Sequence, residues 1–217
     1  TECTAYENLR AGARPPLSGS ALLNGEVIAE QIGGQIFIDG WGLVAPGDEQ
    51  LAARLAAKAA CVTHGGNGVY GGMFVAAAVA AAFDAQDIGE VLRRALNVIP
   101  ADCAYARMVR DIWAFYEGER EDWRACLWYI RKNYWKEQYP GNCHIMPNAA
   151  IMMLSMLYGA GSFSDTINIC NMCGWDTDCN VANVGTILAV LNGLEGIDWK
   201  WGAPIGDFIA FSSVLGD

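Results

Sequence analysis

The chain has 217 residues, of which 53% are hydrophobic, and a formal net charge of −10. A chain of this length buries roughly 70% of the surface that its unfolded form exposes, so it can build one sizeable core. The acidic balance repels phosphate backbones, which disfavours a nucleic-acid partner. The longest apolar run, Val69 to Phe83, is shorter than the ~20 residues of a membrane span, so we expect no membrane segment.

The first part of the chain shows helical periodicity that is interrupted by proline and glycine. Residues 1–10 resemble the end of a helix that is already under way, and the proline- and glycine-rich stretch 11–24 predicts a loop. Isoleucines at helical spacing predict a helix over 26–38. Asp48 is expected to cap the next helix, which ends where a glycine-rich loop begins at His64.

The rest of the chain is predicted to be helical around one central element. Val69–Phe83 is mostly alanine and glycine, whose small side chains let neighbouring backbones approach, so this helix is expected to be packed on all sides. No strand-like alternation, internal repeat or linker is present. We therefore predict an all-α fold, a compact orthogonal multi-helix bundle, as a single domain over 1–217. The remaining helices are expected over 88–98, 104–117, 123–137, 147–158, 164–172 and 178–191.

The eight cysteines are expected to be reduced. A disulfide framework is typical of small secreted chains without a sufficient core, and neither the length nor the cysteine spacing fits that class. The first residues do not resemble a signal peptide. We therefore expect a cytoplasmic protein with free thiols at Cys3, Cys61, Cys103, Cys126, Cys143, Cys170, Cys173 and Cys179.

The most specific local feature is the string Gly174-Trp-Asp-Thr-Asp-Cys-Asn180, at the start of a predicted helix. Aspartates in that position commonly cap a helix and favour its dipole. One cap needs only one carboxylate, however, and Asp176 and Asp178 have mostly apolar neighbours in the sequence. Two carboxylates held together in such surroundings favour a cation, and hard oxygen ligands select Mg²⁺, Mn²⁺ or Ca²⁺.

A competing metal site is suggested by three neighbouring cysteines. Cys170, Cys173 and Cys179 could contribute to a zinc site with a fourth ligand such as His144. Structural zinc requires four closed nitrogen or sulfur ligands, whereas Cys170 and Cys173 lie within a helical pattern. Buried free cysteine is the simpler interpretation.

Two further segments mark helix starts. The loop His64-Gly-Gly-Asn-Gly68 enters a helix near Tyr70, and such a loop exposes backbone N–H groups suited to an anion. It lacks the lysine and hydroxyl of a P-loop and follows no strand, so a plain helix end with a packed His64 is the alternative. His144-Ile-Met-Pro-Asn148 begins another helix, where Asn148 is expected either to cap the helix or to reach a ligand.

Together these segments resemble the ADP-ribosylglycohydrolase family over nearly the whole chain, in order and in spacing. The Gly174–Asn180 string is the most specific part of the resemblance. The family implies an all-helical orthogonal bundle with a binuclear magnesium centre. The other segments that carry the resemblance are Asn8-Leu-Arg-Ala-Gly12, Pro15-Pro16, Glu30-Gln-Ile-Gly-Gly-Gln-Ile36, Asp39-Gly-Trp41, His64 to Tyr70, Ile99-Pro100, His144 with Asn148, Trp201 and Asp207.

The resemblance assigns Asp176 and Asp178 to the carboxylates of the family's Asp-x-Asp-Thr/Ser metal motif, with Mg²⁺, or alternatively Mn²⁺, as the cofactor. Cys179 stands where the family has a hydroxyl, and a thiol is a poor ligand for a hard cation. The family's second motif, Thr-Asp-Asp-Thr near the N-terminus, is not found in this sequence. We expect a preceding segment or a second chain to complete the site and to carry the general base.

The same resemblance implies a pocket for an ADP-ribose-containing substrate. The expected reaction is cleavage of an N-ribosyl bond through an oxocarbenium-like state. Arginine-linked, ester-linked and free ADP-ribosides all stay open as substrates. The alternative is a non-catalytic module that binds ADP-ribose or a nucleotide, which Cys179 and the absent motif favour. The residues expected to line the pocket are His64, Asn67, Gly68, Tyr70, Ser18, Gly19, Ser20, Asn24, Asn148 and Trp175.

Overall fold

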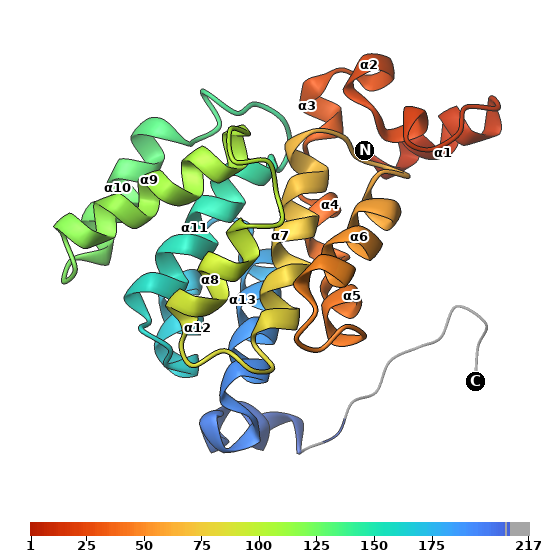
Figure 1. The fold of residues 1–217 in the computed structure, drawn as a ribbon. Helices are drawn as coiled ribbons and strands as arrows, with labels where there is room; N and C mark the ends of the chain where they lie inside the picture. Colours follow the sequence, from red (N-terminus) through yellow and green to blue (C-terminus); the bar gives the residue numbers. More distant parts are fainter. Residues whose placement is uncertain (207, 209–217) are drawn as a thin grey trace.

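The computed structural model describes residues 1–206 and residue 208, and this part of the chain forms helices without any β-strand (Figure 1). Extended pairing is confined to one isolated bridge between Gln31 and His144. The all-α prediction is therefore confirmed. Among the described residues, no helix is both long and apolar enough to cross a membrane. Asp207, to which the family resemblance extended, lies outside the described residues.

The central element is α7 (Asn67–Ala81), which is buried along most of its length. Its glycines and alanines let other backbones approach: a Cβ added at Gly68 would lie only 2.6 Å from the carbonyl oxygen of Ala29. The prediction of a central helix packed on all sides holds for residues 74–81, whereas Val69, Tyr70 and Met73 are only half-buried (Figure 1). The helices around it include α4 (Gly33–Ile36), α5 (Asp39–Leu43), α6 (Glu49–Ala60) and α8 (Ile88–Leu96).

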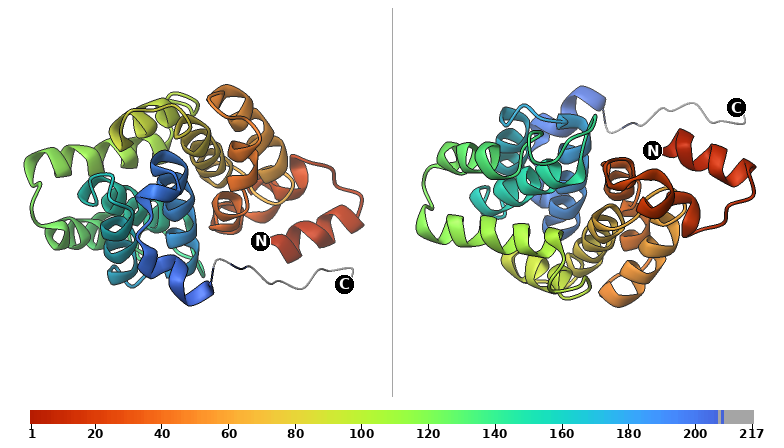
Figure 2. Two further views of the ribbon diagram at one scale, coloured as in Figure 1. Left: turned by 90° about the horizontal axis from the view of Figure 1, so that it is seen from below. Right: turned by 90° about the horizontal axis from the view of Figure 1, so that it is seen from above.

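A second buried helix, α11 (Ile145–Tyr158), carries much of the remaining core. All of its residues from Ile145 to Leu157 are buried, and its methionines suit the irregular space between several neighbours. The main core cluster includes buried residues of α7, α11 and the helices packed around them, whose arrangement is seen from two further sides in Figure 2. These are α9 (Ala104–Gly118), α10 (Trp123–Asn133), α12 (Phe163–Met172) and α13 (Thr177–Asn192).

The predicted helix over 26–38 is wrong, because the chain breaks there into α3 (Glu26–Ala29) and α4. The residues at this break form backbone hydrogen bonds with residues 143–145, at the start of α11. The amide of Ile32 donates to the carbonyl of Cys143, and the amide of Ile145 donates to the carbonyl of Glu30, both at 2.9 Å. These long-range bonds replace local helical ones, so periodicity alone could not reveal the break.

The remaining boundaries follow the sequence expectations closely. Asp48 caps α6 as predicted, since its carboxylate accepts the amide of Leu51 at 2.8 Å. The expected loop over 11–24 is partly helical, because the Ser20 hydroxyl accepts the amide of Leu23 and so caps a short helix. The short helical pieces at the two ends are α1 (Glu2–Arg10), η1 (Leu17–Gly19), α2 (Ala21–Asn24), η2 (Leu194–Gly196), α14 (Trp199–Gly202) and η3 (Ala203–Ile205).

Candidate metal and substrate site

The turn before α13 places Asp176 in an unusual conformation. Its φ of 44° is left-handed, which costs about 1–3 kcal/mol for a residue other than glycine. The Asp176 side chain caps no backbone amide of α13, so the helix-capping interpretation fails for this residue. Its Oδ2 instead accepts a hydrogen bond from the Cys143 thiol at 2.8 Å. The Asp176 carboxylate is therefore engaged by Cys143 and not by the backbone amides of α13.

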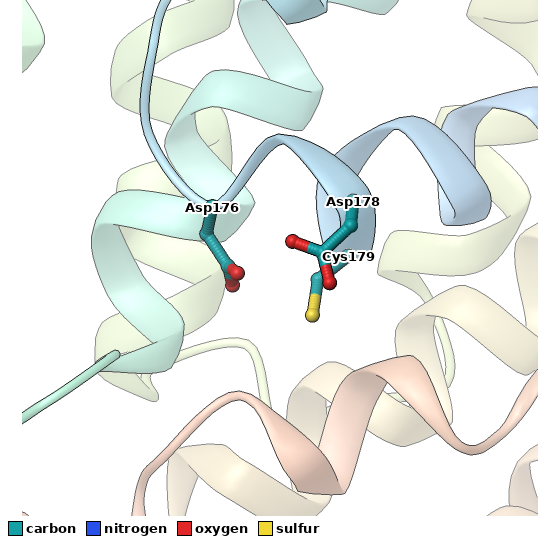
Figure 3. Close-up of side chains that lie close together, drawn as sticks. All are labelled: Asp176, Asp178 and Cys179. Atoms are coloured by element: carbon teal, nitrogen blue, oxygen red, sulfur yellow. The ribbon is translucent and has the colours of Figure 1, made fainter.

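Three potential ligand atoms meet at the start of α13. One atom each from Asp176, Asp178 and Cys179 lies within 4.8 Å of the others, and Figure 3 shows the three side chains directed into the same space. Asp178 is exposed, and the other two are half-buried. Within the described part of the chain, no other cluster of three such side chains meets the same criterion.

The competing zinc site is not formed. Cys170 and Cys173 are completely buried in the main core cluster, and neither joins the group at Cys179. All eight cysteines are free, as expected.

The two thiols nearest the carboxylates are held in their neutral form. Burial raises the pKa of Cys179 to about 12, and the negative charge of Asp176 adds to this effect. Burial also raises the pKa of Cys143 to about 12, together with its hydrogen bond to Asp176. Both groups are therefore thiols at neutral pH as long as no cation is nearby.

A cavity of about 680 Å³ opens beside this group. One wall is the start of α13, with Asp178 and Cys179, and another is the break between α3 and α4. The N-terminal residues Thr1 and Glu2 and the loop before α11 also line this open cavity. Polar groups on these walls are Thr1, Glu2, Gln31, Asn142 and Cys143.

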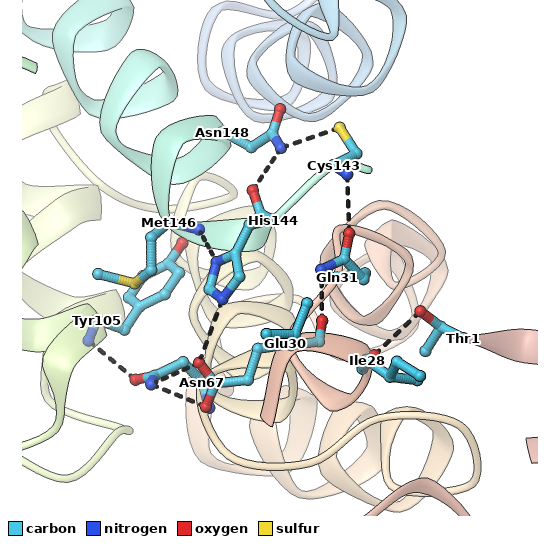
Figure 4. A network of polar contacts seen from close by, with 11 residues as sticks. Thr1, Ile28, Glu30, Gln31, Asn67, Tyr105, Cys143, His144, Met146 and Asn148 are labelled. Atoms are coloured by element: carbon cyan, nitrogen blue, oxygen red, sulfur yellow. Dashed lines mark hydrogen bonds and ion pairs between the residues drawn. The ribbon is translucent and has the colours of Figure 1, made fainter. Parts of the chain in front are cut away.

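A buried polar network supports the wall at the break (Figure 4). The Glu30 carboxylate accepts the backbone amide of Asn67 at 2.7 Å and its side-chain amide at 2.9 Å, while burial raises the pKa of Glu30. The Asn67 Oδ1 accepts the amide of Tyr105 at 3.0 Å. Nε2 of His144 lies 3.8 Å from Glu30, and burial lowers the pKa of His144 to about 4. The predicted substrate residue Asn67 is thus fully engaged within the protein.

His64 is buried between the cavity wall and the glycine loop. Its Nδ1 is 2.7 Å from the Thr63 hydroxyl, whereas its Nε2 has no hydrogen-bond partner among the described residues and lies 3.6 Å from Glu2. Burial lowers the pKa of His64 to about 4, although Glu2 acts in the opposite direction. The imidazole is therefore neutral at physiological pH.

The side chains of Ser18 and Asn24, which were predicted to contact the substrate, form hydrogen bonds within the protein. The Ser18 hydroxyl donates to the carbonyl of Val62 at 2.8 Å, and the Asn24 side chain donates to the carbonyl of Ser18 at 2.9 Å. The backbone of Gly19 lies so close to His64 that a Cβ there would clash. A second cavity, of about 310 Å³, lies beside this loop and is lined by residues that include Ser20, His64, Gly65 and Tyr70.

Two other predicted residues flank the aspartate cluster. The Asn148 amide donates to the carbonyl of His144 at 2.7 Å and to the Cys143 sulfur at 3.3 Å, which leaves its buried Oδ1 without a partner among the described residues. Trp175 packs against Trp135, with ring centroids 4.9 Å apart, and its buried Nε1 likewise has no partner in the described part of the chain.

The sequence did not single out two residues that shape the site. Cys143 contacts Asp176 across 33 positions of sequence, and Gln31 accepts the Cys143 amide at 2.8 Å. The only local signal was the position of Cys143, directly before the segment that starts at His144. Gln31 stood in the middle of a segment that was expected to be a continuous helix.

Comparison with known proteins agrees with the fold and with the resemblance noted in the sequence. The sequence profile of the family described as ADP-ribosylglycohydrolase matches residues 1–215, which is essentially the whole chain. No curated protein and no solved structure gave a match. The chain therefore belongs to the ADP-ribosylglycohydrolase family.

Proposed function

We propose that this chain is a hydrolase that cleaves the N-ribosyl bond of an ADP-ribosylated substrate and depends on a divalent metal ion at Asp176 and Asp178. The observation that carries the proposal is the pairing of these two carboxylates, of which Asp178 lines the 680 Å³ cavity. Small-molecule sites commonly have volumes of about 300–1,000 Å³. The larger cavity lies well inside this range, whereas the cavity near Tyr70, at about 310 Å³, is at its lower limit.

The donor set supports a divalent cation. Two carboxylates confined within 4.8 Å repel each other, and a cation between them removes that repulsion. An ion bound there would supply Lewis-acid polarisation of the ribose next to the bond that breaks. The printed sequence contains no Thr-Asp-Asp-Thr motif, so the proposal names only the two carboxylate ligands that these residues provide.

The protein's own side chains would hold the substrate around that point. Buried acceptors and donors without partners are the groups best placed to bind an entering ligand, because an unpaired buried polar group costs about 1–3 kcal/mol. The Asn148 Oδ1 and the Trp175 Nε1 are such groups beside the aspartates. His64 lines the smaller cavity, and its neutral Nε2 lies 3.6 Å from Glu2, which lines the larger one; it is proposed as a third contact. Ser18, Gly19, Asn24, Asn67 and Gly68 would shape the pocket through the backbone that they hold in place.

The decisive experiment compares two exposed aspartates, each in the first turn of a helix. Asp178 lies in the first turn of α13, and Asp165 lies in the first turn of α12; both are exposed. Release of ADP-ribose from an ADP-ribosylated arginine peptide would be measured with Mg²⁺ or Mn²⁺ present. We expect Asp178→Ala to lose at least about 100-fold in rate while staying folded, because a metal ligand supplies several kcal/mol to the transition state. Asp165→Ala is expected to retain its rate.

Equal rates for the wild type and Asp178→Ala would remove the assignment of the site. No hydrolysis by the wild type, combined with ADP-ribose binding in calorimetry, would favour the non-catalytic binding module instead.

A further inference from the structure

The group at the start of α13 contains a sulfur atom that a magnesium site does not need. The Cys179 thiol lies within 4.8 Å of a carboxylate oxygen from both Asp176 and Asp178, and the three point into one space (Figure 3). Mg²⁺ requires near-octahedral oxygen ligands, and sulfur is an unfavourable donor for it. The donor set therefore fits a purely hard cation poorly.

The same donor set matches a borderline divalent ion. Zn²⁺ accepts cysteine sulfur at about 2.3 Å and carboxylate oxygen at about 2.0–2.2 Å, and catalytic zinc sites use three protein ligands with a fourth position open. Asp176, Asp178 and Cys179 supply three ligands of these types, and Asp178 and Cys179 also line the large cavity. An open fourth position would thus face the space proposed for the substrate.

A second observation concerns the side chains that surround the group. The Cys143 thiol donates to Asp176, and the Asn148 amide donates to the Cys143 sulfur, so a chain of hydrogen bonds orients the carboxylate. Groups that orient a ligating carboxylate are a general feature of metal sites. Asn148 is completely buried, and its Oδ1 has no partner among the described residues, which leaves an acceptor for a group that enters the site.

We propose that Asp176, Asp178 and Cys179 bind one borderline divalent ion of the zinc class in preference to Mg²⁺, and that Cys143 is a positioning residue for Asp176. This inference rests on the proposed function only for the location of the metal. The inference differs from the proposed function in the identity of the ion and in the role that it gives to the Cys179 sulfur.

The test uses Co²⁺ as a spectroscopic probe, because a cobalt–thiolate bond gives a charge-transfer band in the near ultraviolet that oxygen ligands do not give. The full chain would be titrated with Co²⁺ under reducing conditions. We expect the wild type to show the band, Cys179→Ser to lose it, and Cys143→Ser to retain it. The matched control is Cys103→Ser: Cys103 caps α9 through its sulfur, and a serine hydroxyl can do the same.

Competition then identifies the preferred ion. We expect Zn²⁺ to displace the cobalt at concentrations at least about 100-fold lower than Mg²⁺ requires. Cobalt bound without a thiolate band, a band that survives in Cys179→Ser, or no cobalt binding at all would each overturn the inference. Magnesium-dependent hydrolysis with a spectrum typical of oxygen ligands would overturn the inference about the ion and leave the proposed function intact. A thiolate band without hydrolysis would support the inference about the ion and contradict the proposed function.

Discussion

Asp39 provides a stability test that is independent of the metal site. It is the first residue of α5 and is half-buried against α13. Its carboxylate accepts hydrogen bonds from the Asn183 amide at 2.8 Å and the Thr186 hydroxyl at 3.1 Å. Burial nevertheless raises the pKa of Asp39 from 3.8 to about 6, because two neutral donors compensate only part of the lost hydration.

The sign of the effect follows from this shift. A carboxyl group whose pKa is higher in the folded state binds its proton more tightly there, so ionisation opposes folding. The cost is absent below pH 3.8, grows as the pH rises towards 6, and is complete above 6. A shift of about two units, at about 1.4 kcal/mol each, corresponds to about 3 kcal/mol of stability lost between these limits.

Asp39→Asn removes the charge and keeps the shape. The amide oxygen can still accept from Asn183, and the amide nitrogen can donate to the Thr186 hydroxyl oxygen, whose single proton is then free to bond the carbonyl of Ala182. We therefore expect the free energy of unfolding of Asp39→Asn, relative to that of the wild type, to be about 2–3 kcal/mol higher at pH 7.5 than at pH 4.

The assay is urea unfolding followed by circular dichroism at several pH values, with the free energy of unfolding extrapolated to zero denaturant. Asp102→Asn, at an exposed position before α9, is the control for general effects of the lost charge. A difference between Asp39→Asn and the wild type that stays constant from pH 4 to 7.5 would refute the reasoning.

Two further predictions concern the packing around α7. Gly68→Ala is expected to destabilise the protein by about 1–3 kcal/mol, because the new Cβ would lie 2.6 Å from the Ala29 carbonyl oxygen. Gly40→Ala, where the Cβ meets nothing within 4 Å, should be neutral or slightly stabilising in the same unfolding assay. Asn67→Ala is expected to cost about 2–3 kcal/mol, because the buried Glu30 carboxylate and the Tyr105 amide lose their partner; an unchanged midpoint would show that the network of Figure 4 contributes nothing.

Helices that depend on local pattern could be predicted, and those that depend on distant contacts could not. The alanine- and glycine-rich segment correctly predicted the central α7, and Asp48 correctly predicted the start of α6. The helix expected over 26–38 failed, because the backbone of residues 30–32 bonds to residues 143–145 instead. No local signal in either segment specifies that pairing.

The same distinction applies to the candidate site. Asp176 and Asp178 are two positions apart, so their convergence could be expected from the sequence. The contact between Cys143 and Asp176 depends on how α11 and α13 pack, and it was missed. The resemblance had assigned Ser18 and Asn24 to the ligand, but the Ser18 hydroxyl donates to the carbonyl of Val62, 44 positions away, and the Asn24 amide donates to the carbonyl of Ser18.

The pairing of residues 30–32 with 143–145 also has a consequence for the order in which the molecule assembles. Closing a loop of more than a hundred residues lowers the entropy of the chain before any stabilising contact has formed. This junction is therefore expected to form late in folding. The cavity is lined both by the segment around residues 30–32 and by the segment around residue 143, so it needs the two segments to be joined. The two aspartates lie at the start of α13, outside the first of these segments. A partly folded chain would therefore hold the aspartates at the start of α13 before it has any place for a substrate.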